Sequence, residues 1–331
     1  MGVALRPLLS SEPVSIEELG GKIVAVDAFN WIFQFLSSIR LADGSFLIDK
    51  KGRTTTHLNG LFYRSTDLLK YRVKPIFVFD GKAPLFKKKT IEEREKRKNE
   101  ARALADKAET EEERAMYLRR TTEINDYIIQ SSVQLLRLLG IPVVKAPAEG
   151  EAQAAALNAE KKAFAVASQD YDSLLFGSTK LIRNLNISGR RKLPRRGAYV
   201  EVKPEIIDTR KLLEGRSLDR EKLILIALFV GTDYNLGVKG IGPKKALAIV
   251  KNGKRDEILS SYDFGCEAPV RTLFDYFMHP NVISGLDVDF GTLDFDAVTK
   301  FMCGEHDFAE DRIRNALSKL SVREKGLDLY G

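Results

Sequence analysis

The chain has few of the residues that build zinc sites and disulfide scaffolds. Its 331 residues include two cysteines and three histidines. Cys266 and Cys303 are far apart and form no Cys-x-x-Cys pair, which excludes a thiolate zinc cluster and fits a reducing compartment. His57, His279 and His306 are scattered, so we expect them to be structural or exposed and not metal ligands.

Long apolar runs and common nucleotide motifs are also missing. The longest strongly apolar run, residues 223–230, is far shorter than the roughly 20 residues that cross a bilayer, and the first residues show no pattern of a secretory signal. The sequence lacks GxGxxG, GxxxxGK[ST] and HExxH patterns, which are the usual signals of dinucleotide, P-loop and zincin sites. We therefore expect no membrane partner and none of these three kinds of site.

Charge is abundant instead. Charged residues make up 30% of the chain and apolar residues 44%, enough for a buried core in two lobes or one large domain with insertions. The net charge is +7, although acids are concentrated in a few loops. This pattern is typical of a protein that brings a polyanion to a metal site. A surface rich in Lys, Arg and Glu is also typical of hyperthermophile proteins, and both interpretations stand.

Two acids stand at the start of an alanine-rich segment. Glu149 and Glu151 lie on either side of Gly150, shortly after Pro147. Residues two positions apart in a helix differ by roughly 200° of rotation about its axis. These carboxylates therefore converge only at the first turn, where the helix dipole favours acids. We therefore predict that a helix begins at this point.

Two more acids follow the apolar run 163–167, a predicted strand. Asp170 and Asp172 share one face if the chain stays extended beyond Ser168. Crowded carboxylates repel one another unless a cation lies between them, and hard divalent cations prefer oxygen ligands. The four acids predict a Mg²⁺ or Mn²⁺ site. Helix-start acids plus an Asp-rich turn are the alternative interpretation.

Other acids follow predicted buried elements. The β-type runs 22–27 and 75–80 end on Asp27 and Asp80, and Asp233 comes after a buried helix predicted over 221–230. In open α/β sheets, ligands bind at the carboxyl ends of the strands. We expect these acids to share one site with the other four.

Basic clusters accompany the acids. Lys87 to Lys89 follow the Asp80 loop, where an incoming phosphate would arrive, and a long charged helical insertion continues from them. Residues 181–203 predict a β-hairpin with five bases at its tip, Arg190, Arg191, Lys192, Arg195 and Arg196. The hairpin tip is interpreted as a backbone-binding patch, with a solvated turn as the alternative.

Residues 238–250, VKGIGPKKALAIV, predict a glycine turn between two helices. Gly240 and Gly242 would let backbone amides approach a phosphate, while Lys244 and Lys245 add positive charge at the next helix start. The pattern indicates a helix-hairpin-helix that contacts DNA without reading its sequence.

Seven motifs follow one another along the chain: MGV, VAVDAFNWIFQFL, TTTHLNGLFYR, FVFDGKAP, APAEGEAQAA, SQDYDSLLF and VGTDYNLGVKGIGPKKAL. On these motifs nearly the whole chain resembles the flap endonucleases of the 5′-nuclease (XPG/RAD2-like) family, above all its archaeal branch. The resemblance implies an α/β fold with a central, mostly parallel twisted sheet flanked by helices, a helical arch and a helix-two-turn-helix (helix-hairpin-helix) DNA-binding element.

The resemblance also divides the chain into four regions. These are an N-terminal nuclease region (1–98), the helical arch and following helix (99–139), an internal nuclease region with the helix-hairpin-helix (140–254) and a C-terminal helical region (255–331).

Carried over by matching position, the resemblance implies a metal site and a phosphate contact. Seven acids would hold two Mg²⁺ ions, with Mn²⁺ as a substitute: Asp27, Asp80, Glu149, Glu151, Asp170, Asp172 and Asp233. Two such ions can support an in-line displacement at phosphorus. Lys87 and Arg94 match arch residues that contact the scissile phosphate and supply further positive charge.

Further DNA contacts follow from the same resemblance. Phe33 matches an aromatic residue that stacks on a base, Arg40 and Thr55 match residues that hold a 3′ flap, and Gly2 matches a small residue beside the branch point. At the C-terminus, Leu327 and Tyr330 fit a peptide that binds the sliding clamp PCNA. That motif is degenerate, because Glu324 replaces its Gln and Gly331 its last aromatic residue.

The implied function is a 5′-flap endonuclease and 5′→3′ exonuclease that acts on branched DNA in Okazaki fragment maturation and base-excision repair. A monomer in the cytoplasm of an archaeal cell is expected. Two alternatives are kept: a 5′-nuclease that prefers gaps, nicks or bubbles, and a non-catalytic DNA-binding module.

Overall fold

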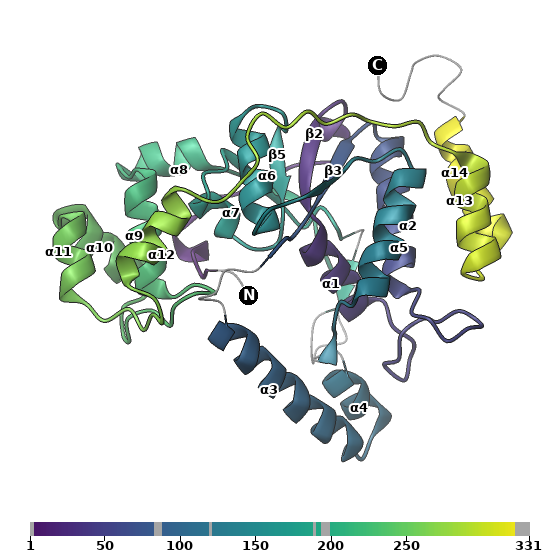
Figure 1. The fold of residues 1–331 in the computed structure, drawn as a ribbon, viewed down its shortest axis with the longest axis horizontal. Helices are drawn as coiled ribbons and strands as arrows, with labels where there is room; N and C mark the ends of the chain where they lie inside the picture. Colours follow the sequence, from purple (N-terminus) through teal and green to yellow (C-terminus); the bar gives the residue numbers. More distant parts are fainter. Residues whose placement is uncertain (1–2, 83–87, 119–120, 188–189, 193–198, 322–331) are drawn as a thin grey trace.

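A seven-stranded sheet runs through the centre of the molecule (Figure 1), whose computed structural model describes residues 3–82, 88–118, 121–187, 190–192 and 199–321. The strand order is β1-β9-β6-β5-β2-β3-β4. The strands are β1 (Glu12–Pro13), β2 (Ile23–Asp27), β3 (Lys74–Phe79), β4 (Val143–Lys145), β5 (Ala165–Ala167), β6 (Lys180–Arg183) and β9 (Glu205–Asp208). Neighbours from β6 to β4 are parallel, and β9 is antiparallel to β6 and β1. The predicted mostly parallel sheet is confirmed.

Helices cover both faces of this sheet (Figure 1). Val24 and Val26 of β2 join one core with α1 (Ala28–Ser38), α2 (Thr56–Lys70) and α5 (Asp126–Leu138). Ala25, between them, joins a second core with α6 (Gly150–Ala159) and α9 (Arg220–Val230). Successive side chains of a strand point to opposite faces, so a strand buried on both faces must be continuously apolar. This explains the unbroken apolar runs of the sequence.

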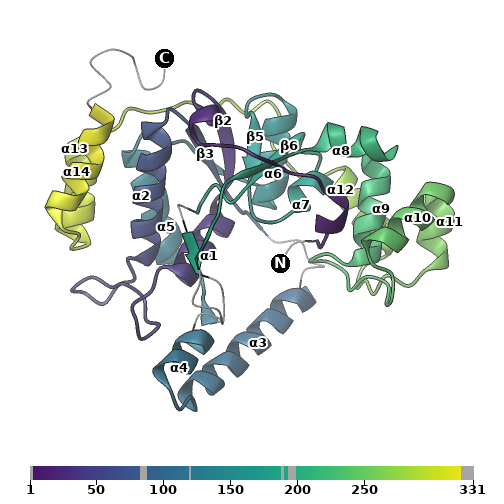
Figure 2. The same cartoon turned by 180° about the vertical axis from the view of Figure 1, so that it is seen from behind.

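Two groups of helices stand at opposite ends of the sheet, as Figures 1 and 2 show. One group holds α8 (Thr209–Arg216), α9, α10 (Pro243–Asn252), α11 (Arg255–Ser261) and α12 (Val270–Met278). The other group places α13 (Phe295–Thr299), the π-helix η5 (Lys300–Glu305) and α14 (Glu310–Ser321) beside α2. Helices α3 (Lys88–Asp106) and α4 (Glu111–Leu118) lie together outside the sheet, below it in Figure 1. In the part of the chain described, no helix is long and apolar enough to cross a membrane.

A basic hairpin is present, but it is shorter than the predicted 181–203, because residues 181–183 belong to β6 of the central sheet. Strands β7 (Arg190–Lys192) and β8 (Tyr199–Glu201) pair antiparallel in a separate two-stranded sheet. Arg190, Arg191 and Lys192 therefore form a strand and not the tip, because Lys192 already pairs with Tyr199. The predicted bases Arg195 and Arg196 lie outside the described residues.

The condition under which Asp170 and Asp172 would share one face, an extended chain beyond Ser168, is not met. The chain turns after β5, and the short helix α7 (Asp172–Leu175) begins at Asp172. Leu174 and Leu175 are almost fully buried in the core shared with α6 and α9. Burial of this adjacent leucine pair favours a helical turn over an extended strand, whose alternate side chains would point to opposite faces.

Candidate active site

Adjacent parallel strands bring polar side chains to one edge of the sheet. In the register of β2, Val26 pairs with Ala167 of β5, and Asp27 pairs with Val78 of β3. Asp27, Ser168 and Asp80 therefore leave the sheet at the same edge. The two predicted buried strands are confirmed; β2 ends on Asp27, and Asp80 directly follows the last residue of β3, Phe79.

The start of α6 adds two acids beside them. Glu149 is the residue before the helix and Glu151 lies in its first turn, as predicted. The backbone N–H of Gly150, between them, donates a hydrogen bond of 2.7 Å to Oδ1 of Asp80. A Cβ atom at Gly150 would lie 2.6 Å from this oxygen, so only glycine allows the helix to approach the end of β3 so closely.

The remaining acids come from three other places in the fold. Asp170 lies in the turn after β5 and accepts a hydrogen bond of 3.2 Å from Nδ2 of Asn30. Asp172 accepts one of 2.9 Å from the backbone N–H of Val3. Asp233 follows α9, and its negative charge acts on Asp172. The structure thus brings together acids that are separated by as many as 206 positions in the printed sequence, from Asp27 to Asp233.

Burial makes several of these carboxyl groups hard to ionise. Desolvation, followed by repulsion from Asp80, raises the pKa of Asp27 to about 8. Desolvation also raises the pKa of Asp172 to about 7, with repulsion from Asp233 and Asp170. The pKa of Glu151 is raised well above its ordinary value by burial and then by repulsion from Asp172. A cation placed among these groups would oppose all of these shifts.

The donor set fits a hard divalent cation, because it consists of carboxylate oxygens, the ligands that Mg²⁺ and Mn²⁺ prefer. In the arrangement described, however, no group of three or more His, Cys, Asp or Glu side chains is poised to hold an ion. The carboxylate oxygens instead meet N–H and O–H donors at Gly150, Val3, Asn30 and Ser168. Metal binding would therefore require some of these carboxylates to move closer together, and each can keep its present donor because a carboxylate accepts more than one bond.

Sequence reasoning missed two polar side chains of the site. Oγ of Ser168 donates to Oε1 of Glu151 at 2.8 Å and lies 3.2 Å from Oδ2 of Asp27. Asn30 connects α1 to the turn that carries Asp170. Their sequence signal is weak but real, because each is a polar residue within three positions of a predicted ligand at the end of an apolar strand.

The predicted 3′-flap residues are mostly engaged inside the protein. Arg40 donates to the carbonyl oxygens of Leu36 and Gly44, both at 2.9 Å, and to Oγ1 of Thr122 at 2.6 Å. Thr55 is buried. Phe33 on α1, by contrast, is 49% exposed, so its ring is accessible for stacking.

The predicted glycine turn lies between α9 and α10. Gly240 has φ +81°, and a Cβ atom at Gly240 or Gly242 would meet nothing within 4 Å, so the backbone there is open to an approaching group. Lys244 and Lys245 lie exposed in the first turn of α10. The Nζ atom of Lys245 donates to the carbonyl oxygen of Gly240 at 3.1 Å.

Several predicted residues have no described environment. Gly2, Lys87, Leu327 and Tyr330 lie outside the described residues, as do the two hairpin bases already named. Arg94 belongs to α3, and Arg190, Arg191 and Lys192 belong to β7, but only their backbone is described. Their roles stay predictions.

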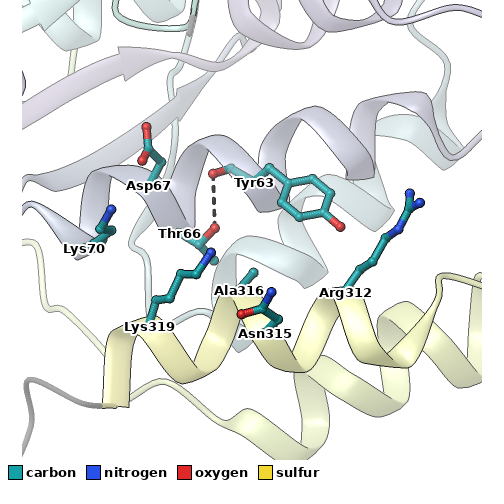
Figure 3. A pocket seen from close by; sticks show the side chains of 8 residues that line it. All are labelled: Tyr63, Thr66, Asp67, Lys70, Arg312, Asn315, Ala316 and Lys319. Atoms are coloured by element: carbon teal, nitrogen blue, oxygen red, sulfur yellow. Dashed lines mark hydrogen bonds between the residues drawn. The ribbon is translucent and has the colours of Figure 1, made fainter. Parts of the chain in front are cut away.

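A cavity of about 340 Å³ lies away from the acids, between α2 and α14 (Figure 3). Its lining includes Lys70, Arg312 and Lys319, together with Asp67, which pairs with Arg64 at 2.6 Å. None of the seven acids lines it. The candidate site is therefore set by strand ends and helix starts, not by this cavity.

Known proteins match the chain closely. The profiles of the XPG N-terminal domain and the XPG I-region match residues 1–101 and 140–233. Flap endonuclease 1 of Thermococcus onnurineus (strain NA1) is 48% identical over 330 residues, covering 98% of this chain and 96% of the relative. These matches span both halves of the candidate site.

Solved structures agree with the sequence matches. Flap endonuclease-1 from Methanococcus jannaschii superposes with a TM-score of 0.76 at 36% identity, covering 96% of this chain and 98% of that one. The catalytic core of Rad2 in complex with DNA substrate gives a TM-score of 0.69 at 26% identity, with coverage of 96% and 97%. Fold, motif order and full-length similarity agree, and the chain belongs to the flap endonuclease 1 family of XPG/RAD2 nucleases.

Proposed function

We propose that this structure-specific 5′-flap endonuclease hydrolyses a phosphodiester bond near the flap junction, with divalent cations held by the seven acids. The observation that carries the metal assignment is the convergence of the buried Asp27 and Asp172 with the half-buried Glu151 at one sheet edge, where their charges repel one another. A DNA-binding protein gains nothing from buried acids that face a polyanion unless cations compensate them.

The protein's own residues would divide the work. The acids would hold Mg²⁺, or Mn²⁺ in its place, in a pair of sites whose ions supply an activated water and stabilise charge on the reacting phosphate when bound. Lys87 and Arg94 of the arch region would hold that phosphate in line. Phe33, exposed on α1, would stack on the adjacent base.

The residues that bind duplex DNA would lie away from the acids at which the phosphodiester bond is hydrolysed. The open backbone at Gly240 and Gly242 and the exposed Lys244 and Lys245 support a phosphate contact at the start of α10. The hairpin bases of β7 would add a second backbone contact. The engaged guanidinium of Arg40 supports a role in shaping the 3′-flap region and not a free contact in it.

Several finer points stay predictions. They are a 5′→3′ exonuclease activity, a monomeric state, a cytoplasmic location, the four-region division and a weak clamp contact through Leu327 and Tyr330. Roles in Okazaki fragment maturation and base-excision repair fit the family. Comparing incision on flap, nick, gap and bubble substrates would rank the alternative preferences.

The first experiment is cleavage of a 5′-labelled double-flap DNA with Mg²⁺, with a chelator, and with Asp172→Ala. We expect a Mg²⁺-dependent cut near the junction. Cleavage by this variant should fall by more than the roughly 10- to 100-fold that follows the loss of a residue that only supports a metal ligand. Asp172 is itself a proposed ligand, so its removal should cost more. Flap binding should persist, and Asp289→Ala, an exposed acid outside the site, should cut normally.

Two results would change the proposal. Cleavage by Asp172→Ala at the wild-type rate would remove that residue from the ligand set. Tight flap binding without cutting in Mg²⁺ or Mn²⁺ would favour the non-catalytic DNA-binding module.

A further inference from the structure

Ser168 joins three acid-bearing segments through one hydroxyl group. Its Oγ donates to Oε1 of Glu151 at 2.8 Å, lies 3.2 Å from Oδ2 of Asp27 and accepts from the backbone N–H of Asp170 at 3.2 Å. The residue is 2% exposed, so it cannot reach a substrate directly. Its single O–H donor and one of its two acceptor lone pairs are used by the groups that carry the acids.

Asn30 holds the same segments from the other side. Its Nδ2 donates to Oδ2 of Asp170 at 3.2 Å, and its Oδ1 accepts from the backbone N–H of Gln169 at 3.2 Å. Its own backbone N–H donates to Oδ1 of Asp27 at 3.0 Å. One residue of α1 thus fixes the end of β2 and the turn after β5.

These contacts oppose a repulsive arrangement. Asp27, Glu151 and Asp170 repel one another when charged, and nothing in their chain positions forces their side chains to converge. Hydrogen bonds from the hydroxyl and amide groups stabilise each carboxyl group where it stands. Neither side chain has an obvious second use, since Ser168 is buried and both polar ends of Asn30 are occupied.

We propose that Ser168 and Asn30 are positioning residues that arrange Asp27, Glu151 and Asp170 for divalent cations. This inference rests on the proposed function, because it assigns the same acids as ligands. It predicts that these two side chains control cation affinity without taking part in DNA binding.

The test measures Mn²⁺ binding to the full chain by calorimetry, without DNA. Ser168→Ala and Asn30→Leu should bind Mn²⁺ about 10- to 100-fold more weakly, the usual effect of losing an outer-shell partner. Ser168→Thr, which keeps the hydroxyl, should restore most of the affinity. Ser178→Ala is the matched control, because this buried serine has no hydrogen-bond partner for its Oγ among the described residues.

A second readout separates positioning from simple loss of structure. Cleavage by Ser168→Ala and Asn30→Leu should recover as Mg²⁺ is raised, while flap binding in chelator stays at the wild-type level. Should Ser168→Ala fail to fold, Asn30→Leu carries the test, because it removes the donor to Asp170 without adding charge to the site.

The results separate the positioning roles of Ser168 and Asn30 from the proposed function on which they rest. If the wild type binds Mn²⁺ and cuts, but the two variants match Ser178→Ala in Mn²⁺ affinity, the positioning roles are wrong and the proposed function stands. If the wild type neither binds Mn²⁺ nor cuts flaps, the proposed function fails and this inference fails with it.

Discussion

At the scale of single residues, the acids of the candidate site are held in place by hydrogen-bond donors that have no part in the proposed reaction. The amides of Val3 and Gly150 and the side chains of Ser168 and Asn30 meet four different acids. Buried carboxyl groups need such partners, since an unsatisfied one costs a large part of its hydration free energy. The acids can therefore be brought together without a cation, but burial and mutual repulsion raise the pKa of Asp27 and Asp172.

His57, a buried residue away from the acids, makes the free energy of unfolding depend on pH. Burial, followed by the charge of His306, lowers the pKa of His57 to about 3, and its Nε2 lies 2.7 Å from Oγ of Ser131. The folded state therefore binds fewer protons than the unfolded state below the ordinary pKa of about 6.5. Stability from this residue is complete above pH 6.5 and is lost as the pH falls from 6.5 toward 3.

We expect His57→Gln to remove this part of the acid sensitivity. At pH 4.5 the effect amounts to about 2 to 3 kcal/mol, at roughly 1.4 kcal/mol for each pH unit below 6.5. Urea unfolding at pH 7.5 and 4.5 measures it: the stability gap between wild type and variant should shrink in acid. The exposed His279→Gln is the control and should keep the wild-type profile. A gap that stays constant with pH would contradict the assignment.

At the scale of elements, the loop between α1 and α2 supports helix α4. Gly44 has φ +82°, and a Cβ atom there would lie 2.5 Å from Cα of Ala115. Arg40 ties the same loop to Thr122, on the far side of α4 in the chain, and its guanidinium lies 4.0 Å from the ring centre of Phe46. The loop therefore contacts α4 directly and is also tied to the chain that follows it.

Gly44→Ala should push α4 away from this loop, because the atom that the new methyl group meets belongs to the backbone and cannot rotate aside. Flap cleavage in single-turnover conditions should fall by about 10- to 100-fold, since small displacements of groups that position a substrate are costly. Trypsin should also cut more quickly at Lys107, between α3 and α4.

Gly52→Ala is the matched control for this substitution. Gly52 lies in the same loop at φ +75°, but a Cβ atom there meets nothing within 4 Å. Both variants carry the cost of a left-handed alanine, roughly 1 to 2 kcal/mol, so only the contact with Ala115 differs. Equal cleavage and equal proteolysis in the two variants would show that α4 does not depend on this contact.

At the scale of the whole molecule, basic surfaces away from the acids must attract a polyanion such as DNA. The chain carries a net charge of +7, yet the seven acids concentrate negative charge at one sheet edge. DNA must therefore be held by basic surfaces elsewhere, and its affinity must depend on salt.

Charge reversal at Lys244 and Lys245 tests one such surface. Lys244→Glu with Lys245→Glu should weaken flap binding and lower the slope of log affinity against log salt by about 2, roughly 0.9 for each lost phosphate contact. The reversal of Arg210 and Lys211, exposed on α8, serves as a control for net charge. An identical salt slope in the two double variants would assign the effect to overall charge and not to the α10 contact.

The sequence alone determined much of this protein. Apolar runs ending on Asp27 and Asp80 predicted two buried strands and their ligand-bearing edge, and Pro147 with Gly150 predicted the start of α6. Such signals are local, because strand propensity, helix starts and turn residues act over a few positions. The residue patterns picked out all seven acids, and the family motifs implied that they hold two metal ions.

The tertiary structure decided what depends on distant neighbours. Burial of Leu174 and Leu175 favoured the short helix α7, which no local sequence signal had predicted. The register of β2 with β5 set Ser168 beside Asp27, and the packing of α1 carried Asn30 to Asp170; the only local signal of either residue is a polar side chain within three positions of a predicted ligand. Contacts between residues more than 100 positions apart are set by how strands and helices pack, so only the folded chain reveals them.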